Sequence, residues 1–141
     1  MVGIADKIQQ VEEKIVAACE SRGRDRSKVK LVIVTKSTDL ESIKEVISLG
    51  FRDFGENHVQ RLKKVSAEVN DFLAENADDK ACPAKVNWHM IGHLQRNKVN
   101  QVLPLTCMVH SLDTLRLAEE LNTVAGKLHV TSDVLLQVNA S

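Results

Sequence analysis

Residues 31–50 read LVIVTKSTDLESIKEVISLG, and this stretch decides the fold class. Its first five residues form a continuous apolar, β-branched run that is typical of a parallel strand buried on both faces. After a polar turn, apolar residues recur at helical spacing at positions 40, 43, 46 and 47, and Gly50 follows as a stop signal. We expect Thr38 and Glu41 to form a capping box where this helix begins. The stretch therefore predicts a strand followed by a helix.

The same alternation continues in both directions along the chain. Apolar spacing predicts a first helix from residue 4 to about 18, with a turn at Gly23. Further strands are expected at 51–55, 86–91, 107–110 and 133–138, and further helices at 59–73, from about 95 to 104, and at 112–126. Residues 74–85 are polar, contain Pro83 and predict a surface loop.

Strands that alternate with helices imply an α/β fold with a parallel sheet and right-handed crossovers. Two architectures fit this order of elements. One is a five-stranded doubly wound sheet, and the other is a (β/α)₈ barrel of which this chain supplies about the first five strands. The spacing of apolar residues does not choose between them.

Composition limits the class of protein. The 141 residues predict one domain, 1–141, and 43% hydrophobic with 27% charged residues predict a globular chain. Lys and Arg number 19, as do Asp and Glu, which argues against nucleic-acid binding because such proteins usually carry a basic surplus. The apolar runs are only strand-sized, which predicts no membrane span, and the start of the chain lacks a signal-peptide pattern. Three cysteines without C-x-x-C spacing indicate reduced thiols and a cytoplasmic protein.

Polar residues follow the predicted strands at the edge where α/β proteins place their sites: Lys36, Glu56, Asn57, Gly92, His93, Ser111 and Asn139. A lysine that ends a buried strand is the strongest candidate among them. Partial burial in a barrel mouth would favour its neutral, nucleophilic form and a Schiff base. The alternative interpretation of Lys36 is a solvated lysine at a strand end.

Three further motifs have weaker interpretations. His89 and His93 are four residues apart, as in a zinc-binding helix, but they straddle a strand end and no cysteine or carboxylate joins them in the sequence. We therefore expect hydrogen bonding at the barrel mouth and no metal ligands. The run 95–98 could bind a phosphate at a helix start or be a solvated helix start. Cys107 has no evident base partner and is predicted to be a core thiol.

Several blocks together are similar to one known family. They are VIVTK at 32–36, RDFGENHVQ at 52–60 and WHMIGHLQRNK at 88–98, followed in order by HSLD at 110–113 and LLQVN at 135–139. They resemble the YggS/PROSC family of pyridoxal 5′-phosphate (PLP) binding proteins, also called PLP homeostasis proteins. The resemblance covers nearly the whole chain from about residue 4.

The resemblance implies an amino-terminal portion of a TIM barrel of the alanine racemase N-terminal type. It implies that PLP is held as an aldimine on Lys36, that Asn57 lies beside the cofactor, and that no residue is catalytic, because the family lacks the second domain that supplies the opposing base in racemases. The implied function is intracellular PLP (vitamin B6) homeostasis. The alternatives are a racemase-type PLP enzyme and a truncated barrel that binds cofactor weakly.

Two departures from the family qualify the resemblance. The family usually has Ser-Lys-Thr-Lys where this chain has TKST at 35–38, so one positive charge is lost while Lys36 is kept. Family members are also considerably longer, and the residues that hold the PLP phosphate are expected beyond residue 141. The implied partners are PLP and PLP-dependent apo-enzymes, with no nucleic acid or membrane. The full-length family is expected to be monomeric, whereas this short chain is expected to self-associate through open sheet edges.

Overall fold

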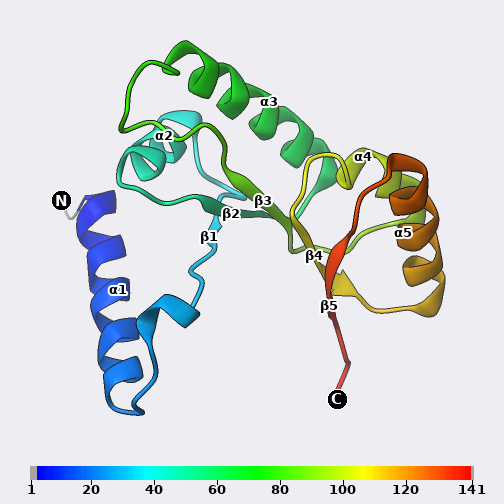
Figure 1. Ribbon diagram of the computed structural model, residues 1–141, viewed down its shortest axis with the longest axis horizontal. Helices are drawn as coiled ribbons and strands as arrows, with labels where there is room; N and C mark the ends of the chain where they lie inside the picture. Colours follow the sequence, from blue (N-terminus) through cyan, green and yellow to red (C-terminus); the bar gives the residue numbers. More distant parts are fainter. Residues whose placement is uncertain (1–2, 141) are drawn as a thin grey trace.

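The computed structural model describes residues 3–140 and places a five-stranded parallel sheet beside a series of helices (Figure 1). The strands are β1 (Ile33–Val34), β2 (Asp53–Glu56), β3 (Asn87–Met90), β4 (Met108–Leu112) and β5 (Asp133–Leu136). The α-helices are α1 (Ile4–Glu20), α2 (Leu40–Ser48), α3 (Val59–Glu75), α4 (Val99–Val102) and α5 (Leu115–Leu128). Two short 3₁₀-helices are η1 (Arg26–Lys28) and η2 (Arg96–Lys98). No helix in this part of the chain is long and apolar enough to cross a membrane.

The strands are arranged in the order β1-β2-β3-β4-β5, and every pair is parallel. Successive helices touch, α2 against α3, α3 against α4 and α4 against α5, and they form an arc along one side of the sheet (Figure 1). A doubly wound sheet instead reverses its strand order at a switch point, so that its helices cover both faces. The α/β class with a parallel sheet is therefore confirmed, and the doubly wound alternative is wrong.

The hydrophobic core lies between the helices and the outer face of the sheet. The sheet contributes buried side chains of Phe54, Trp88, Met90 and Val109, and helices α2, α3 and α5 contribute Ile43, Ile47, Leu62, Val69, Leu117 and Leu121. Burial of each large apolar side chain contributes about 1.5–3 kcal/mol. Because side chains alternate along a strand, the intervening residues Asp53, His89 and His110 point to the inner face, where hydrogen bonds join them.

The predicted capping box of helix α2 is wrong. Asp39 is the N-cap, and its carboxylate accepts a hydrogen bond of 2.8 Å from the Ser42 amide. The Thr38 carbonyl is instead held by Arg61. The turns predicted at Gly23 and Gly50 are confirmed, because both residues adopt the left-handed φ that glycine tolerates, 60° and 100°.

Two further helix predictions also need correction. Leu112 is the last residue of β4, and α5 begins only at Leu115, capped by the Thr114 hydroxyl, which accepts from the Leu117 amide. Gly126 does not end this helix, because α5 continues to Leu128 and His129 takes the left-handed C-cap position at φ 54°. The helix expected from about residue 95 is the 3₁₀ turn η2 followed by the four-residue α4.

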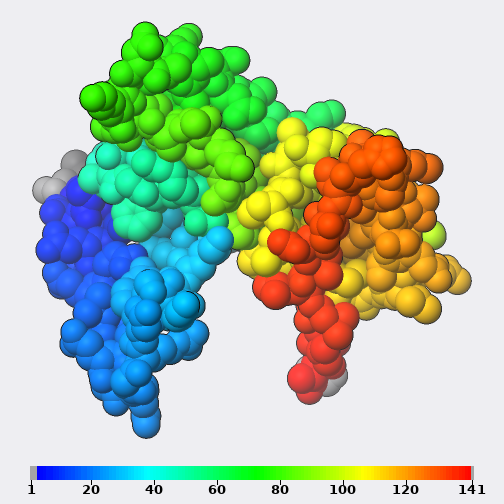
Figure 2. Space-filling view, viewed as in Figure 1, coloured from blue at the N-terminus to red at the C-terminus, as the bar shows by residue number. Residues whose placement is uncertain are grey.

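The two outer strands leave apolar side chains exposed. Among the described residues β1 pairs only with β2, and β5 pairs only with β4. Val34 is 45% exposed, and Leu136 and Val138 are each 73% exposed. Figure 2 shows an open space between the light-blue segment around β1 and the red segment around β5. The apolar exposure predicted for both edges is confirmed.

We expect the 141-residue chain to self-associate through the β5 edge, because an unpaired strand with exposed apolar side chains is a template for pairing. Leu136→Lys should weaken self-association by about tenfold or more, since it places a charge on the contact surface. Sedimentation velocity over a concentration series measures the effect. Leu115→Lys is the matched control, because Leu115 is 76% exposed but lies at the start of α5. A concentration-independent monomer would contradict the prediction.

Candidate functional site

The two predicted cofactor residues follow neighbouring strands at the same edge of the sheet. Val34 aligns with Gly55 in the β1–β2 ladder, and the Thr35 amide donates a 3.1 Å hydrogen bond to the Gly55 carbonyl. The same register, extended by two residues, aligns Lys36 with Asn57. Asn57 is half-buried, but Lys36 is exposed to solvent. The partial burial considered for Lys36 is therefore not found, and the structure places the lysine as a solvated residue at a strand end.

An ion pair between the buried Glu56 and the half-buried Arg61 fixes the backbone that carries Lys36. The Glu56 side chain is fully buried and accepts hydrogen bonds from the Thr35 hydroxyl at 2.6 Å and from Arg61 Nε at 3.1 Å. The Arg61 guanidinium also donates to the carbonyl oxygens of Thr35, at 3.0 Å, and Thr38. These carbonyls lie on either side of Lys36 and Ser37, so Arg61 holds both ends of the short loop.

Sequence reasoning missed this clamp, which we define as Thr35, Glu56 and Arg61. The sequence marks Glu56 only as a polar residue at a strand end and gives no prediction for Arg61. A usable signal exists in the sequence, because a carboxylate at the end of an apolar strand requires a partner when it is buried. An arginine five residues later, in the first turn of the following helix, lies within reach of that carboxylate.

The backbone of Gly92, two residues after the end of β3, packs closely against the backbone of Asn57. A Cβ atom added at Gly92 would lie 2.1 Å from the Asn57 carbonyl oxygen, so this close backbone approach requires a residue without a side chain. The Gly92 carbonyl accepts a 2.7 Å hydrogen bond from the Ser111 hydroxyl in β4. Contacts therefore run along the carboxyl edge from β4 through Gly92 to Asn57, next to Lys36.

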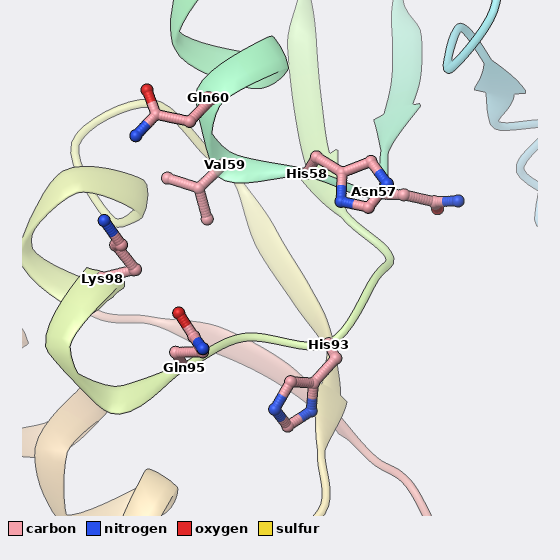
Figure 3. Close-up of a pocket in the computed structure, with 7 residues that line it drawn as sticks. All are labelled: Asn57, His58, Val59, Gln60, His93, Gln95 and Lys98. Carbon is pink, nitrogen blue, oxygen red and sulfur yellow. The ribbon is translucent and has the colours of Figure 1, made fainter.

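A separate cavity of about 420 Å³ opens between the start of α3 and the η2 segment (Figure 3). His93, Gln95 and Lys98 line one side, and Asn57 to Gln60 line the other. In Figure 3 the Asn57 side chain points away from Lys98 and Gln95, although Asn57 is among the residues that line the cavity. Residues 95–97 are exposed and precede a helix of only four residues, which fits the interpretation of a solvated helix start.

His89 and His93 do not act as a pair. His93 is exposed and lies 3.7 Å from Asp113, whereas His89 is buried inside β3 on the inner face of the sheet. His89 Nε2 lies 3.0 Å from Asp53 Oδ1, and its Nδ1 lies 2.9 Å from His110 Nε2. The predicted hydrogen bonding of His89 is confirmed, but its carboxylate and cysteine neighbours come from β2 and the start of β4, which the parallel register brings alongside and which the sequence did not indicate.

Cys107 is not a core thiol. It is exposed at the start of β4, and its sulfur lies 3.4 Å from His89 Nε2. Although the residue is exposed overall, partial burial of the Cys107 thiol raises its pKa, and the nearby Asp53 charge raises it further. Burial would also raise the pKa of Asp53, but hydrogen bonds from His89, Lys30 and Asn87 lower it below its ordinary value. Burial, followed by the charge of His89, lowers the pKa of His110.

Comparison with models of known protein families gives no match. A protein of Aquifex aeolicus is 34% identical to the chain over 134 residues, which are 95% of this chain and 54% of that protein. It is named pyridoxal phosphate homeostasis protein, as are relatives from Pseudomonas aeruginosa and other organisms. The chain is a homologue of the pyridoxal phosphate homeostasis proteins. It spans about half the length of the curated relatives it matches.

Solved structures agree with this relationship. PipY of Synechococcus elongatus, a structure with PLP bound, superposes with a TM-score of 0.71 at 31% identity over 92% of this chain and 55% of that chain. An unknown protein from Bifidobacterium adolescentis superposes with a TM-score of 0.83 at 32% identity over all of this chain and 59% of its own. The resemblance predicted from the sequence blocks is therefore confirmed.

Proposed function

We propose that this chain binds PLP and serves intracellular PLP homeostasis, with Lys36 as the residue that bonds the cofactor and Asn57 beside it. The observation that carries the proposal is the alignment of Lys36 and Asn57 at the carboxyl edge, in a chain that superposes on a PLP-bound homologue. We further propose that residues 1–141 form one unit of a (β/α)₈ barrel of the alanine racemase type. The sequential order of the five parallel strands supports this architecture.

The residues at this edge fit part of the cofactor. Lys36 offers an exposed primary amine to an aldehyde, and Asn57 offers an amide that can donate and accept hydrogen bonds. The clamp fixes the backbone on both sides of Lys36, which orients the amine. When bound, PLP supplies an electron sink for carbanions. Residues 3–140 contain no glycine-rich loop that would cradle its phosphate at this edge.

The proposed function is tested by titrating the chain with PLP and with pyridoxal, which lacks the phosphate. We expect a visible absorbance change with both compounds and affinities that differ by less than about tenfold, because this edge offers the amine and the amide without a phosphate cradle. A failure of both compounds to change the spectrum would refute the proposal. A strong preference for PLP would show that the phosphate is held by residues we have not assigned.

We propose a carrier role without catalysis. PLP chemistry on amino acids needs a positioned base on each face of the cofactor for racemisation, and the sequence offers Lys36 for one face and contains no tyrosine for the other. We therefore expect exchange of the α-proton of L-alanine in deuterium oxide to proceed no faster than with free PLP. Proton NMR measures the exchange. Sustained exchange that disappears in Lys36→Ala would favour the racemase-type alternative.

Loss of the clamp should make the backbone around Lys36 more mobile while the lysine itself is kept. Arg61→Ala leaves the buried Glu56 carboxylate without its cation, which we expect to cost about 1–3 kcal/mol of unfolding free energy. Reductive labelling of Lys36 by PLP should also become slower. Urea unfolding and mass mapping of the label measure the two effects. Adding Glu56→Gln to Arg61→Ala should recover part of the stability, because a neutral amide needs no counter-ion, and failure to recover any would contradict this explanation.

A further inference from the structure

A second group of reactive side chains, which includes neither Lys36 nor Asn57, lies on the inner face of the sheet. Asp53 begins β2, His89 lies within β3, and Cys107 immediately precedes β4. One ligand atom from each of the three residues lies within 4.8 Å of the others. The proposed function uses none of these side chains.

The geometry excludes a nucleophilic triad of cysteine, histidine and aspartate. In such a triad one ring nitrogen of the histidine faces the nucleophile, and the other faces the carboxylate. Here the Cys107 sulfur and the Asp53 carboxylate both face the same nitrogen, Nε2 of His89, at 3.4 Å and 3.0 Å. Three atoms therefore converge on one position instead of forming a relay.

We propose that Asp53, His89 and Cys107 form a Zn²⁺ site with water as the fourth ligand. Oxygen, nitrogen and sulfur donors of these kinds bind zinc at roughly 2.0–2.3 Å, so neighbouring ligand atoms in a tetrahedron lie about 3.4–3.6 Å apart. The distances from His89 Nε2 to Asp53 Oδ1 and to Cys107 Sγ, 3.0 Å and 3.4 Å, need to expand by only a few tenths of an ångström, and the third pair of ligand atoms, which lies within 4.8 Å, needs to close to about 3.6 Å. On binding, the Cys107 thiol loses its proton to solvent and the thiolate coordinates the metal.

The surroundings orient the three ligands. His89 Nδ1 lies 2.9 Å from His110 Nε2, so the second ring nitrogen is held and Nε2 is directed at the site, as outer-shell partners do in metal centres. Asn87 Nδ2 donates to Asp53 Oδ1 at 3.2 Å and fixes the carboxylate. Lys30 opposes the binding of a cation, because its ammonium lies 3.2 Å from the same Asp53 Oδ1 atom. The Lys30 side chain is 60% exposed and can swing into solvent when a cation binds.

Metal at this position would join β2, β3 and the start of β4 on the inner face of the sheet. Such a cross-link stabilises the folded chain, because a ligand that binds only the folded state shifts the unfolding equilibrium. The zinc site shares no residue with the PLP site formed by Lys36 and Asn57, although His89 aligns with Gly55, two residues before Asn57. Failure of one proposal leaves the other unaffected.

The test is a zinc titration of the full chain in competition with a chromophoric chelator. We expect one Zn²⁺ per chain, a rise in the melting temperature with zinc, and a thiolate-to-metal charge-transfer band when Co²⁺ is used instead. Cys107→Ser should weaken binding by at least about tenfold and abolish the band. Cys82→Ser is the matched control, because Cys82 is a partly exposed free thiol outside the site. This variant should leave the zinc affinity and the charge-transfer band unchanged.

A second variant distinguishes the loss of a zinc ligand from a general loss of the fold. Lys30→Gln removes the competing ammonium and should tighten zinc binding severalfold, an effect that a damaged fold would not produce. The proposal is wrong if Cys107→Ser binds zinc like the unaltered chain, if Cys82→Ser loses the band, or if Lys30→Gln weakens binding.

Discussion

Lys36→Ala should remove the pyridoxyl label completely from the chain after incubation with PLP and borohydride reduction. Thr35, Asn57 and Gly92, the other residues named at this edge, offer no primary amine, and an alanine cannot bond the cofactor aldehyde. The visible absorbance change should vanish as well. Because Lys36 is exposed and contributes nothing to the core, the variant should keep the unfolding midpoint of the unaltered chain.

The matched control is Lys127→Ala, which removes an exposed lysine from the last turn of α5. It should keep the label on Lys36, as peptide mapping by mass spectrometry would show. Label distributed evenly over surface lysines in the unaltered chain, or retained in Lys36→Ala, would refute the assignment.

Gly92→Ala should damage both the fold and the binding edge. The added methyl carbon would lie 2.1 Å from the Asn57 carbonyl oxygen and 2.7 Å from its carbonyl carbon, and backbone atoms cannot rotate out of the way as a side chain can. We expect a loss of about 3 kcal/mol or more in unfolding free energy, at the upper end of the effects of overpacking. The displaced Asn57 should also reduce the affinity for PLP.

Urea unfolding of Gly92→Ala beside Gly126→Ala provides the measurement. Gly126 lies inside α5, and an added Cβ would meet no atom within 4 Å apart from its chain neighbours and its own helix backbone, so alanine there should stabilise the chain by roughly 0.5–1 kcal/mol. The two substitutions are chemically identical and should act in opposite directions. A Gly92→Ala variant as stable as the unaltered chain would show that the backbones of β2 and β3 can separate at this edge.

The sequence by itself determined the order and type of the elements. The apolar run at 31–35 and the helical spacing after it predicted β1 and α2, and the same patterns located the other strands within a few residues. These signals are local, because burial of one face imposes a period of two or 3.6 residues on neighbouring side chains. The blocks around Lys36 and Asn57 also sufficed to indicate the family, because they resemble the family's own sequence blocks.

Only the tertiary structure decided which distant residues meet. The strand order that excludes a doubly wound sheet, the clamp of Arg61 on both sides of Lys36, and the approach of Gly92 to Asn57 depend on how β1 to β4 align. The same holds for Asp53, His89 and Cys107. Their separations in the sequence gave no sign of contact, so the partners of His89 were missed and Cys107 was wrongly predicted to be a core thiol. Register between parallel strands is set by long crossovers and by the packing of whole helices, so no local pattern encodes it.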